Sequence, residues 1–182
     1  MTKRENIWNV PNVLTMIRLA LIGVFVVFYV QGRLYWAMAT FIVASLTDFL
    51  DGFIARRYHL VTNFGKLMDP LADKLMLITA LVCLTVSGRV PLWLMAAIIA
   101  KELLMVVGAY VLLKHGVVVQ AKFIGKLSTV VFMLAVIATF LNAYTAPYDT
   151  YLQFLAFALS LAAMFWYLVD TVAALRKHKI QA

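Results

Sequence analysis

Long apolar runs alternate with short polar breaks along almost the whole chain. A helix that crosses a bilayer needs about 20 mostly apolar residues. The breaks contain glycine, proline and charged residues, which are typical of helix ends. We expect six membrane-spanning helices, over Val13–Val30, Leu34–Ala55, Leu67–Val86, Pro91–Leu113, Phe123–Leu141 and Tyr151–Leu175.

The pattern therefore predicts an all-α integral membrane protein. No internal repeat, low-complexity tract or linker divides residues 1–182, so we expect a single membrane domain. Ahead of Pro11, the residues Ile7 and Trp8 predict a short amphipathic segment along the membrane interface, because tryptophan favours the depth of the lipid headgroups.

Composition excludes the soluble classes. Of the 182 residues, 65% are hydrophobic and 13% are charged, whereas a soluble domain has about 25% charged residues. A soluble globular fold, a disordered chain and a coiled coil are all excluded by so little charge. The single cysteine, Cys83, cannot form an internal disulfide.

Basic residues gather on one side of the predicted spans. Six spans place both termini on the same side, which carries Lys3, Arg4, Arg56, Arg57, Lys66, Lys74, Lys114, Lys122, Lys126, Arg176, Lys177 and Lys179, whereas the opposite loops carry Arg33 and Arg89. The positive-inside rule then places both termini in the cytoplasm, with the protein in the cell membrane. Attraction to anionic lipid explains the net charge of +8, so we expect a lipid bilayer and no nucleic acid as partner.

Four aspartates fall within the second and third predicted spans. Asp48 and Asp51 are one turn apart, as are Asp69 and Asp73, so each pair lies on one face of its helix. Each carboxylate costs about 2.5–3.5 kcal/mol inside a membrane. An antiparallel hairpin brings all four to a similar depth, about 12 Å from the cytoplasmic boundary.

Carboxylates gathered in this way need positive charge beside them. Oxygen ligands suit Mg²⁺, Mn²⁺ or Ca²⁺, and no histidine or cysteine is placed to favour zinc. Small residues on the acidic faces leave room for a ligand, and nearby basic residues are suited to phosphate: Gly52, Ala55, Gly65, Arg56, Arg57, Lys66 and Lys74. These features predict phosphoryl-group transfer assisted by two metal ions. A cation-coupled transporter is the alternative from another class, although the acids lie near one membrane face and no inverted repeat is visible.

The segment Asp-Phe-Leu-Asp-Gly-Phe-Ile-Ala-Arg over 48–56, with Gly65, Asp69 and Asp73 after it, resembles the signature of the CDP-alcohol phosphatidyltransferase family. The resemblance implies transfer of a phosphatidyl group from CDP-diacylglycerol to a small alcohol, with release of CMP and with Mg²⁺ or Mn²⁺, expected as two ions. By position, the expected metal ligands are Asp48, Asp51, Asp69 and Asp73, and Asp73 is also the expected general base. Gly52, Ala55, Arg56 and Gly65 would line the CDP site.

The segment Pro11-Asn12-x-x-Thr15-x-x-Arg18 leads into the first predicted span and resembles the start of family members that use glycerol 3-phosphate as acceptor. Because these polar residues recur every three positions, they are suited to face the site together. The resemblance places Asn12 and Thr15 at the CDP donor and Arg18 at the acceptor phosphate. The alternative is helix capping by Asn12 and snorkelling of Arg18 to the interface.

A dianionic acceptor also needs fixed positive charge, for which we expect Lys101, Lys122 and Lys126 in addition to Arg18. Lys101-Glu102 stands where the glycerol 3-phosphate members commonly have Arg-Glu, and Ser128 stands where they have lysine. Lysine lacks the two-pronged geometry that arginine offers a phosphate, so alternatives stay open for both the residue and the acceptor. For Lys101 the alternatives are a local ion pair with Glu102 or snorkelling to the interface. The alternative acceptor is phosphatidylglycerol, as in a cardiolipin synthase of the CDP-diacylglycerol type, followed by inositol or serine.

Small residues along the fourth and sixth predicted spans let helices approach closely. They are Gly108, Ala109, Ala158, Ala162 and Ala163. They are compatible with a homodimer and equally with packing inside one chain.

Overall fold

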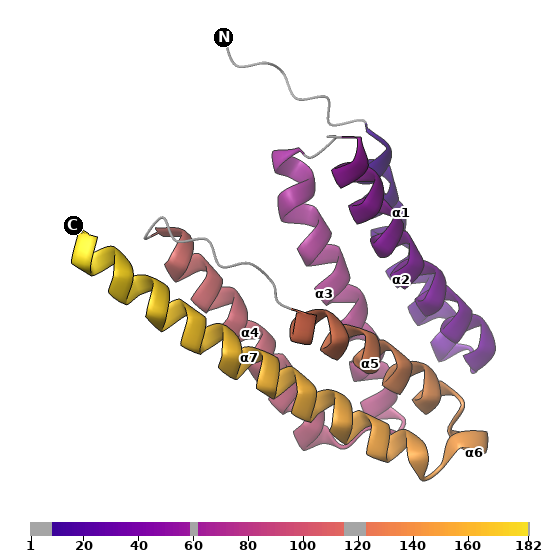
Figure 1. The fold of residues 1–182 in the computed structure, drawn as a ribbon. Coiled ribbons are helices and arrows are strands. Elements are labelled where there is room, and N and C mark those ends of the chain that lie inside the picture. The colour runs from indigo at the N-terminus through magenta and orange to yellow at the C-terminus, as the bar shows by residue number, and fades with distance from the viewer. Residues whose placement is uncertain (1–8, 59–61, 115–122, 182) are drawn as a thin grey trace. The chain divides into compact units, whose positions relative to one another are not determined.

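The computed structural model describes residues 9–58, 62–114 and 123–181, and this part of the chain is helical, without strands (Figure 1). All six apolar segments expected from the sequence form helices. A short seventh helix, α6, lies between the fifth and sixth of them. The predicted interfacial segment with Ile7 and Trp8 lies outside the described residues. The helices are α1 (Val10–Val30), α2 (Leu34–Arg57), α3 (Asn63–Val86), α4 (Leu92–Lys114), α5 (Phe123–Phe140), α6 (Asn142–Thr145) and α7 (Tyr148–Gln181).

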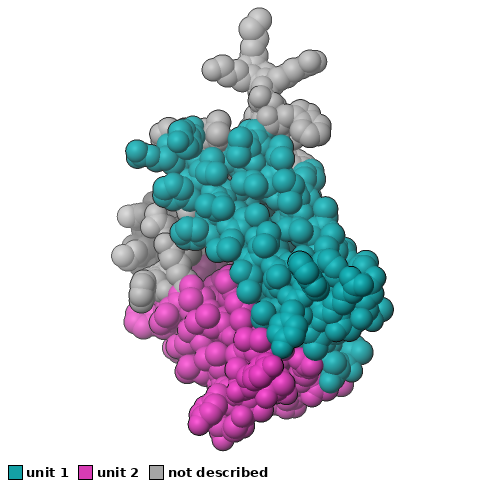
Figure 2. Space-filling view, turned by 90° about the vertical axis from the view of Figure 1, so that its right-hand side faces the viewer, with its two compact units in different colours: residues 1–87 teal, residues 88–182 magenta. Residues whose placement is uncertain are grey.

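The helices form two compact units, residues 1–87 with α1 to α3 and residues 88–182 with α4 to α7 (Figure 2). The single membrane domain expected over residues 1–182 stays a prediction. In the first unit α1 packs along both α2 and α3 (Figure 1). Fully buried alanines, including Ala37, Ala44, Ala72 and Ala80, lie in its core. Small side chains of this kind let helix backbones approach closely.

Both ends of α1 are fixed by local hydrogen bonds. At its start the side chain of Asn9 accepts a hydrogen bond from the Asn12 backbone N–H, and Pro11 occupies the first turn. The alternative interpretation, in which Asn12 itself caps the helix, is therefore wrong. At its end Gly32 has φ +72°, and the N–H groups of Gly32 and Arg33 donate to the carbonyls of Tyr29 and Phe28. This left-handed C-terminal turn favours glycine and reverses the chain into α2.

In the second unit α5 and α4 pack against α7. A polar network fixes the end of α5. Arg89 Nη1 donates to the backbone carbonyls of Thr139 and Phe140 at 3.3 and 3.2 Å. Gln153 Nε2 donates to the Thr139 hydroxyl at 2.9 Å. The two bonds from Arg89 satisfy carbonyl groups that the end of a helix leaves without a partner.

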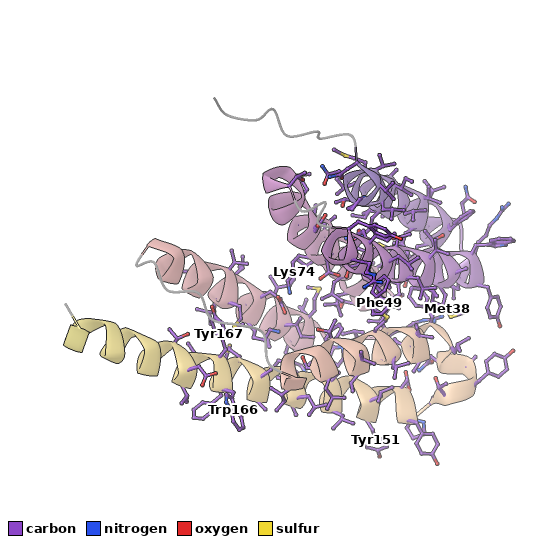
Figure 3. The ribbon with its side chains drawn as sticks, turned by 45° about the horizontal axis from the view of Figure 1, so that its top comes forward. Met38, Phe49, Lys74, Tyr151, Trp166 and Tyr167 are labelled. Carbon is purple, nitrogen blue, oxygen red and sulfur yellow. The ribbon has the colours of Figure 1, made fainter. Side chains whose placement is uncertain are left out.

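Within the described residues, three helical segments are long and apolar enough to cross a membrane: Val10–Val30, Leu34–Ile54 and Tyr148–Thr171. Many large apolar side chains on these helices are exposed. Tyr151 and Trp166, for example, project outward from α7 (Figure 3). A surface of this kind needs lipid around it. The protein is therefore a membrane protein, helical throughout its described elements.

Candidate active site

One face of α1 carries three buried polar side chains, each about one turn from the next. Asn12, Thr15 and Arg18 are almost completely buried, and Arg18 is 1% exposed. Buried polar groups need hydrogen-bond partners, and a buried charge needs an opposite charge. The neighbouring helices α2 and α3 supply both. Of the three residues that the sequence placed on one face, Thr15 and Arg18 contact aspartates, whereas Asn12 contacts Thr62 at the start of α3.

Arg18 joins the two aspartates of α2. Its Nη1 lies 2.8 Å from Asp48 Oδ1, and its Nη2 donates a hydrogen bond to Asp51 Oδ2. Asp51 is 2% exposed, whereas the side chain of Asp48 is 41% exposed. One guanidinium thus contacts two carboxylates in different environments. That of Asp51 is buried between the helices, and that of Asp48 is partly exposed at the surface of the first unit.

Thr15 contacts the third helix. Its Oγ1 lies 2.5 Å from Asp69 Oδ1 on α3 and 3.1 Å from the Pro11 carbonyl oxygen. Asp73 lies one turn further along α3 and is half-buried. We call Asp48, Asp51, Asp69 and Asp73 the acidic centre. Through Arg18 and Thr15, α1 contacts an aspartate of each of the two helices that contribute to it.

The start of α3 is fixed against α1 by a small hydrogen-bond network. The Thr62 hydroxyl donates to Asn12 Oδ1 at 3.1 Å and accepts from the Gly65 backbone N–H at 3.0 Å. A Cβ at position 65 would lie 2.8 Å from Asn12 Oδ1 and 3.3 Å from Thr62 Oγ1, closer than carbon normally approaches oxygen. Glycine at this position therefore allows α3 to reach α1 one turn before Asp69.

We predict that Gly65→Ala lowers the melting temperature of the purified protein in detergent. Alanine favours a helix over glycine by about 1 kcal/mol, but the added methyl overlaps Asn12, at a cost of about 1–3 kcal/mol. Gly23→Ala on α1 is the matched control, because a Cβ at position 23 has nothing within 4 Å. A Gly65→Ala protein as stable as the Gly23→Ala protein would contradict this packing.

The remaining predicted residues divide into three groups. Gly52 follows Asp51 on α2 and is half-buried. Ala55 and Arg56 lie on α2, and Lys126 on α5, but their side chains are outside the described residues, as is all of Lys122. Lys101 on α4 belongs to the second unit, and its Nζ lies 2.5 Å from Glu102 Oε1. The local ion pair that stood as the alternative for Lys101 is thus present in the structure.

The donor set of the acidic centre suits a hard divalent cation. It consists of carboxylate oxygens, the ligands that Mg²⁺ and Mn²⁺ prefer. Within the described ranges no three histidine, cysteine or acidic side chains converge on one point. Asp48 and Asp51 converge on Arg18 instead, which shows that this pair already attracts a cation. The carboxylate ligands of the acidic centre are therefore of the type that binds a divalent metal ion.

The contacts of Arg18, Thr15 and Thr62 were not expected from the sequence. We placed Asn12 and Thr15 at the donor and Arg18 at the acceptor, but Arg18 and Thr15 bind carboxylates directly. The three-residue spacing of Asn12, Thr15 and Arg18 predicted that they share one face of the helix, but it did not predict which residues they contact. Thr62 was not expected at all. The sequence feature that could have predicted its role is a threonine at the start of a helix, where its side chain can accept a hydrogen bond from the backbone N–H three residues later.

Comparison with known proteins decides the family. Residues 8–173 match the family described as CDP-alcohol phosphatidyltransferase. The chain belongs to this family. It is therefore an enzyme of the phosphatidyltransferase class, and the matched range includes the acidic centre on α2 and α3.

The chain is similar to curated proteins that are named for different acceptors. A Bacillus subtilis CDP-diacylglycerol–glycerol-3-phosphate 3-phosphatidyltransferase is 39% identical over 74% of this chain and 78% of its own length. A protein of the same name from Blochmanniella floridana is 30% identical over the full length of both chains. A Streptomyces coelicolor cardiolipin synthase (CMP-forming) is 33% identical over 72% of this chain and 64% of its own length.

Proposed function

We propose that the protein transfers a phosphatidyl group from CDP-diacylglycerol to glycerol 3-phosphate and releases CMP. The relative from Blochmanniella floridana, which bears this activity name and aligns over the whole chain, is the observation that carries the acceptor assignment. The Bacillus subtilis relative supports it. The acidic centre, with α1 packed against both of its helices, supports the reaction class.

The bond changes define what the residues must do. A hydroxyl oxygen of glycerol 3-phosphate forms a bond to the phosphorus of the phosphatidyl group, while the bond from that phosphorus to the oxygen of CMP breaks. The hydroxyl proton passes to a carboxylate, for which we propose Asp73 on α3. CMP leaves with the electron pair of the broken bond.

We propose that Asp48, Asp51, Asp69 and Asp73 hold two Mg²⁺ or Mn²⁺ ions. When bound, these ions neutralise the pyrophosphate and stabilise the leaving CMP. Gly52, Ala55, Arg56 and Gly65 would line the CDP pocket. Lys122 and Lys126 would bind the acceptor phosphate, with a smaller part for Lys101 because Glu102 already offsets its charge.

The proposal extends to topology. Six spans with both termini and the acidic centre on the cytoplasmic side place Asp48 and Asp51 near the inner membrane boundary. Phe49 lies between these two aspartates on α2 and Phe53 follows them, and both side chains are largely exposed (Phe49 is labelled in Figure 3). They suit the acyl chains of a donor that remains in lipid while its cytidine group lies in water. Small residues on α4 and α7 suit close packing, either within one chain or in a homodimer.

An acceptor assay tests the proposed function. Membranes that contain the protein receive CDP-diacylglycerol and either labelled glycerol 3-phosphate or labelled phosphatidylglycerol, with Mg²⁺ or Mn²⁺ or with EDTA. We expect CMP release and phosphatidylglycerophosphate only with glycerol 3-phosphate and metal. Release with phosphatidylglycerol alone would assign the chain to the activity named for the Streptomyces coelicolor relative. Full activity in EDTA would contradict the metal assignment.

A further inference from the structure

Arg18 occupies the acidic centre in a way that a substrate-binding arginine does not. Both of its terminal nitrogens are engaged, one with Asp48 and one with Asp51. The side chain is 1% exposed, and within the described part of the chain its Nε is buried with no hydrogen-bond acceptor. The guanidinium is therefore committed to the carboxylates and closed off from solvent.

A metal ion and Arg18 draw on the same oxygens. A carboxylate that binds a divalent cation directs lone pairs and negative charge toward it. In the structure Asp51 accepts a hydrogen bond from Arg18, and Asp48 forms an ion pair with the same guanidinium. Asp51 is almost completely buried, so without a cation beside it the carboxylate would be desolvated and uncompensated. A positive charge is needed at this place whether or not a metal is bound.

We infer that Arg18 is the built-in counter-cation of the acidic centre. It holds Asp48 and Asp51 together before metal binds, and a bound metal displaces it from part of that contact. The inference rests on the proposed function in taking Asp48 and Asp51 as metal ligands. It replaces the expected role of Arg18 at the acceptor phosphate with that of a positioning residue.

Thr15 can be compared with Arg18, because it contacts the acidic centre without carrying a charge. It contacts Asp69 from the same face of α1, at 2.5 Å. Loss of its hydroxyl removes a hydrogen bond without removing a competing cation. If charge competition is the role of Arg18, the two residues differ in their effect on metal affinity, although both contact the same centre.

The first experiment measures the Arg18 pairing without metal or substrate. In EDTA we expect Arg18→Gln to lower the melting temperature of the purified protein by about 5 °C or more, because it leaves Asp51 buried without its cation. The double variant Arg18→Gln with Asp51→Asn should recover part of this loss. Arg33→Gln is the control, since Arg33 is exposed at the start of α2. Equal melting temperatures for Arg18→Gln and Arg33→Gln would overturn the inference.

The second experiment measures Mn²⁺ binding to the same proteins by electron paramagnetic resonance of the free ion. We expect Arg18→Gln to bind Mn²⁺ about tenfold more tightly than the wild type, because one competing unit charge is gone. Thr15→Val and Arg33→Gln should show no such gain. Unchanged or weaker Mn²⁺ binding by Arg18→Gln, with a raised KM for glycerol 3-phosphate, would overturn the inference and restore the acceptor role.

Arg18→Lys covers the case in which Arg18→Gln does not accumulate in membranes. A single ammonium group cannot make the two-nitrogen contact to both aspartates, so its Mn²⁺ affinity should lie above that of the wild type. If Arg18→Lys binds Mn²⁺ with the same affinity as the wild type, the proposed displacement of Arg18 by the metal is wrong. The acceptor assay is independent of both experiments, because a different acceptor would leave the pairing of Arg18 and the Mn²⁺ affinities as described.

Discussion

Asp51→Asn is expected to lower the rate of CMP release by roughly a hundredfold to a thousandfold, a loss typical of removing one group that stabilises charge in a transition state. Asparagine keeps the size of the side chain but removes its charge. Asp51 is buried, belongs to the proposed metal ligands and accepts a hydrogen bond from Arg18. The measurement is the initial rate of CMP release in membranes with equal amounts of wild-type and variant protein.

Asp170→Asn is the matched control for this variant. It makes the same change on α7, outside the acidic centre, and should keep a rate close to that of the wild type. If Asp51→Asn also keeps the wild-type rate, or if both variants lose activity equally, the proposed role of the buried carboxylate is wrong.

Asp73→Asn is expected to lower kcat by about a hundredfold to ten-thousandfold, the range that a general base contributes. The carboxamide cannot accept the proton of the acceptor hydroxyl. Asp73 is half-buried on α3, one turn from Asp69, so the change should leave membrane insertion intact. Steady-state kinetics with CDP-diacylglycerol and glycerol 3-phosphate separate kcat from the two KM values.

The KM values distinguish proton transfer from substrate binding. A base acts in the chemical step, so Asp73→Asn should lower kcat by a much larger factor than it raises the KM for CDP-diacylglycerol, to which Asp73 contributes as a proposed metal ligand. A large rise in this KM with an unchanged kcat would indicate that Asp73 binds the donor and does not accept the proton of the acceptor hydroxyl. Wild-type turnover would remove its proposed role altogether.

Much of the fold follows from local sequence physics. Apolar runs near 20 residues long predict every long helix, because an apolar segment in lipid must satisfy its backbone hydrogen bonds internally. The boundaries depend on finer contacts. The Asn9 cap starts α1 three residues earlier than expected, at Val10. The helix α6 was missed because four residues are too few for a periodic pattern.

The acidic centre was predictable in part. Helical spacing places Asp48 with Asp51, and Asp69 with Asp73, on common faces, and the same rule puts Asn12, Thr15 and Arg18 on one face of α1. The rule cannot say which face meets which helix, because that depends on packing between elements distant in sequence. The contact of Arg18 with Asp51, 33 residues away, therefore had no local signal.

Equilibrium binding of Mn²⁺ to Asp51→Asn and to Asp69→Asn tests most directly whether α2 and α3 share one divalent-metal centre. The account predicts that each variant binds Mn²⁺ at least about tenfold more weakly than the wild type, because each loses one charged ligand, and that Asp170→Asn does not. Wild-type affinity in either aspartate variant would contradict a centre that both helices build.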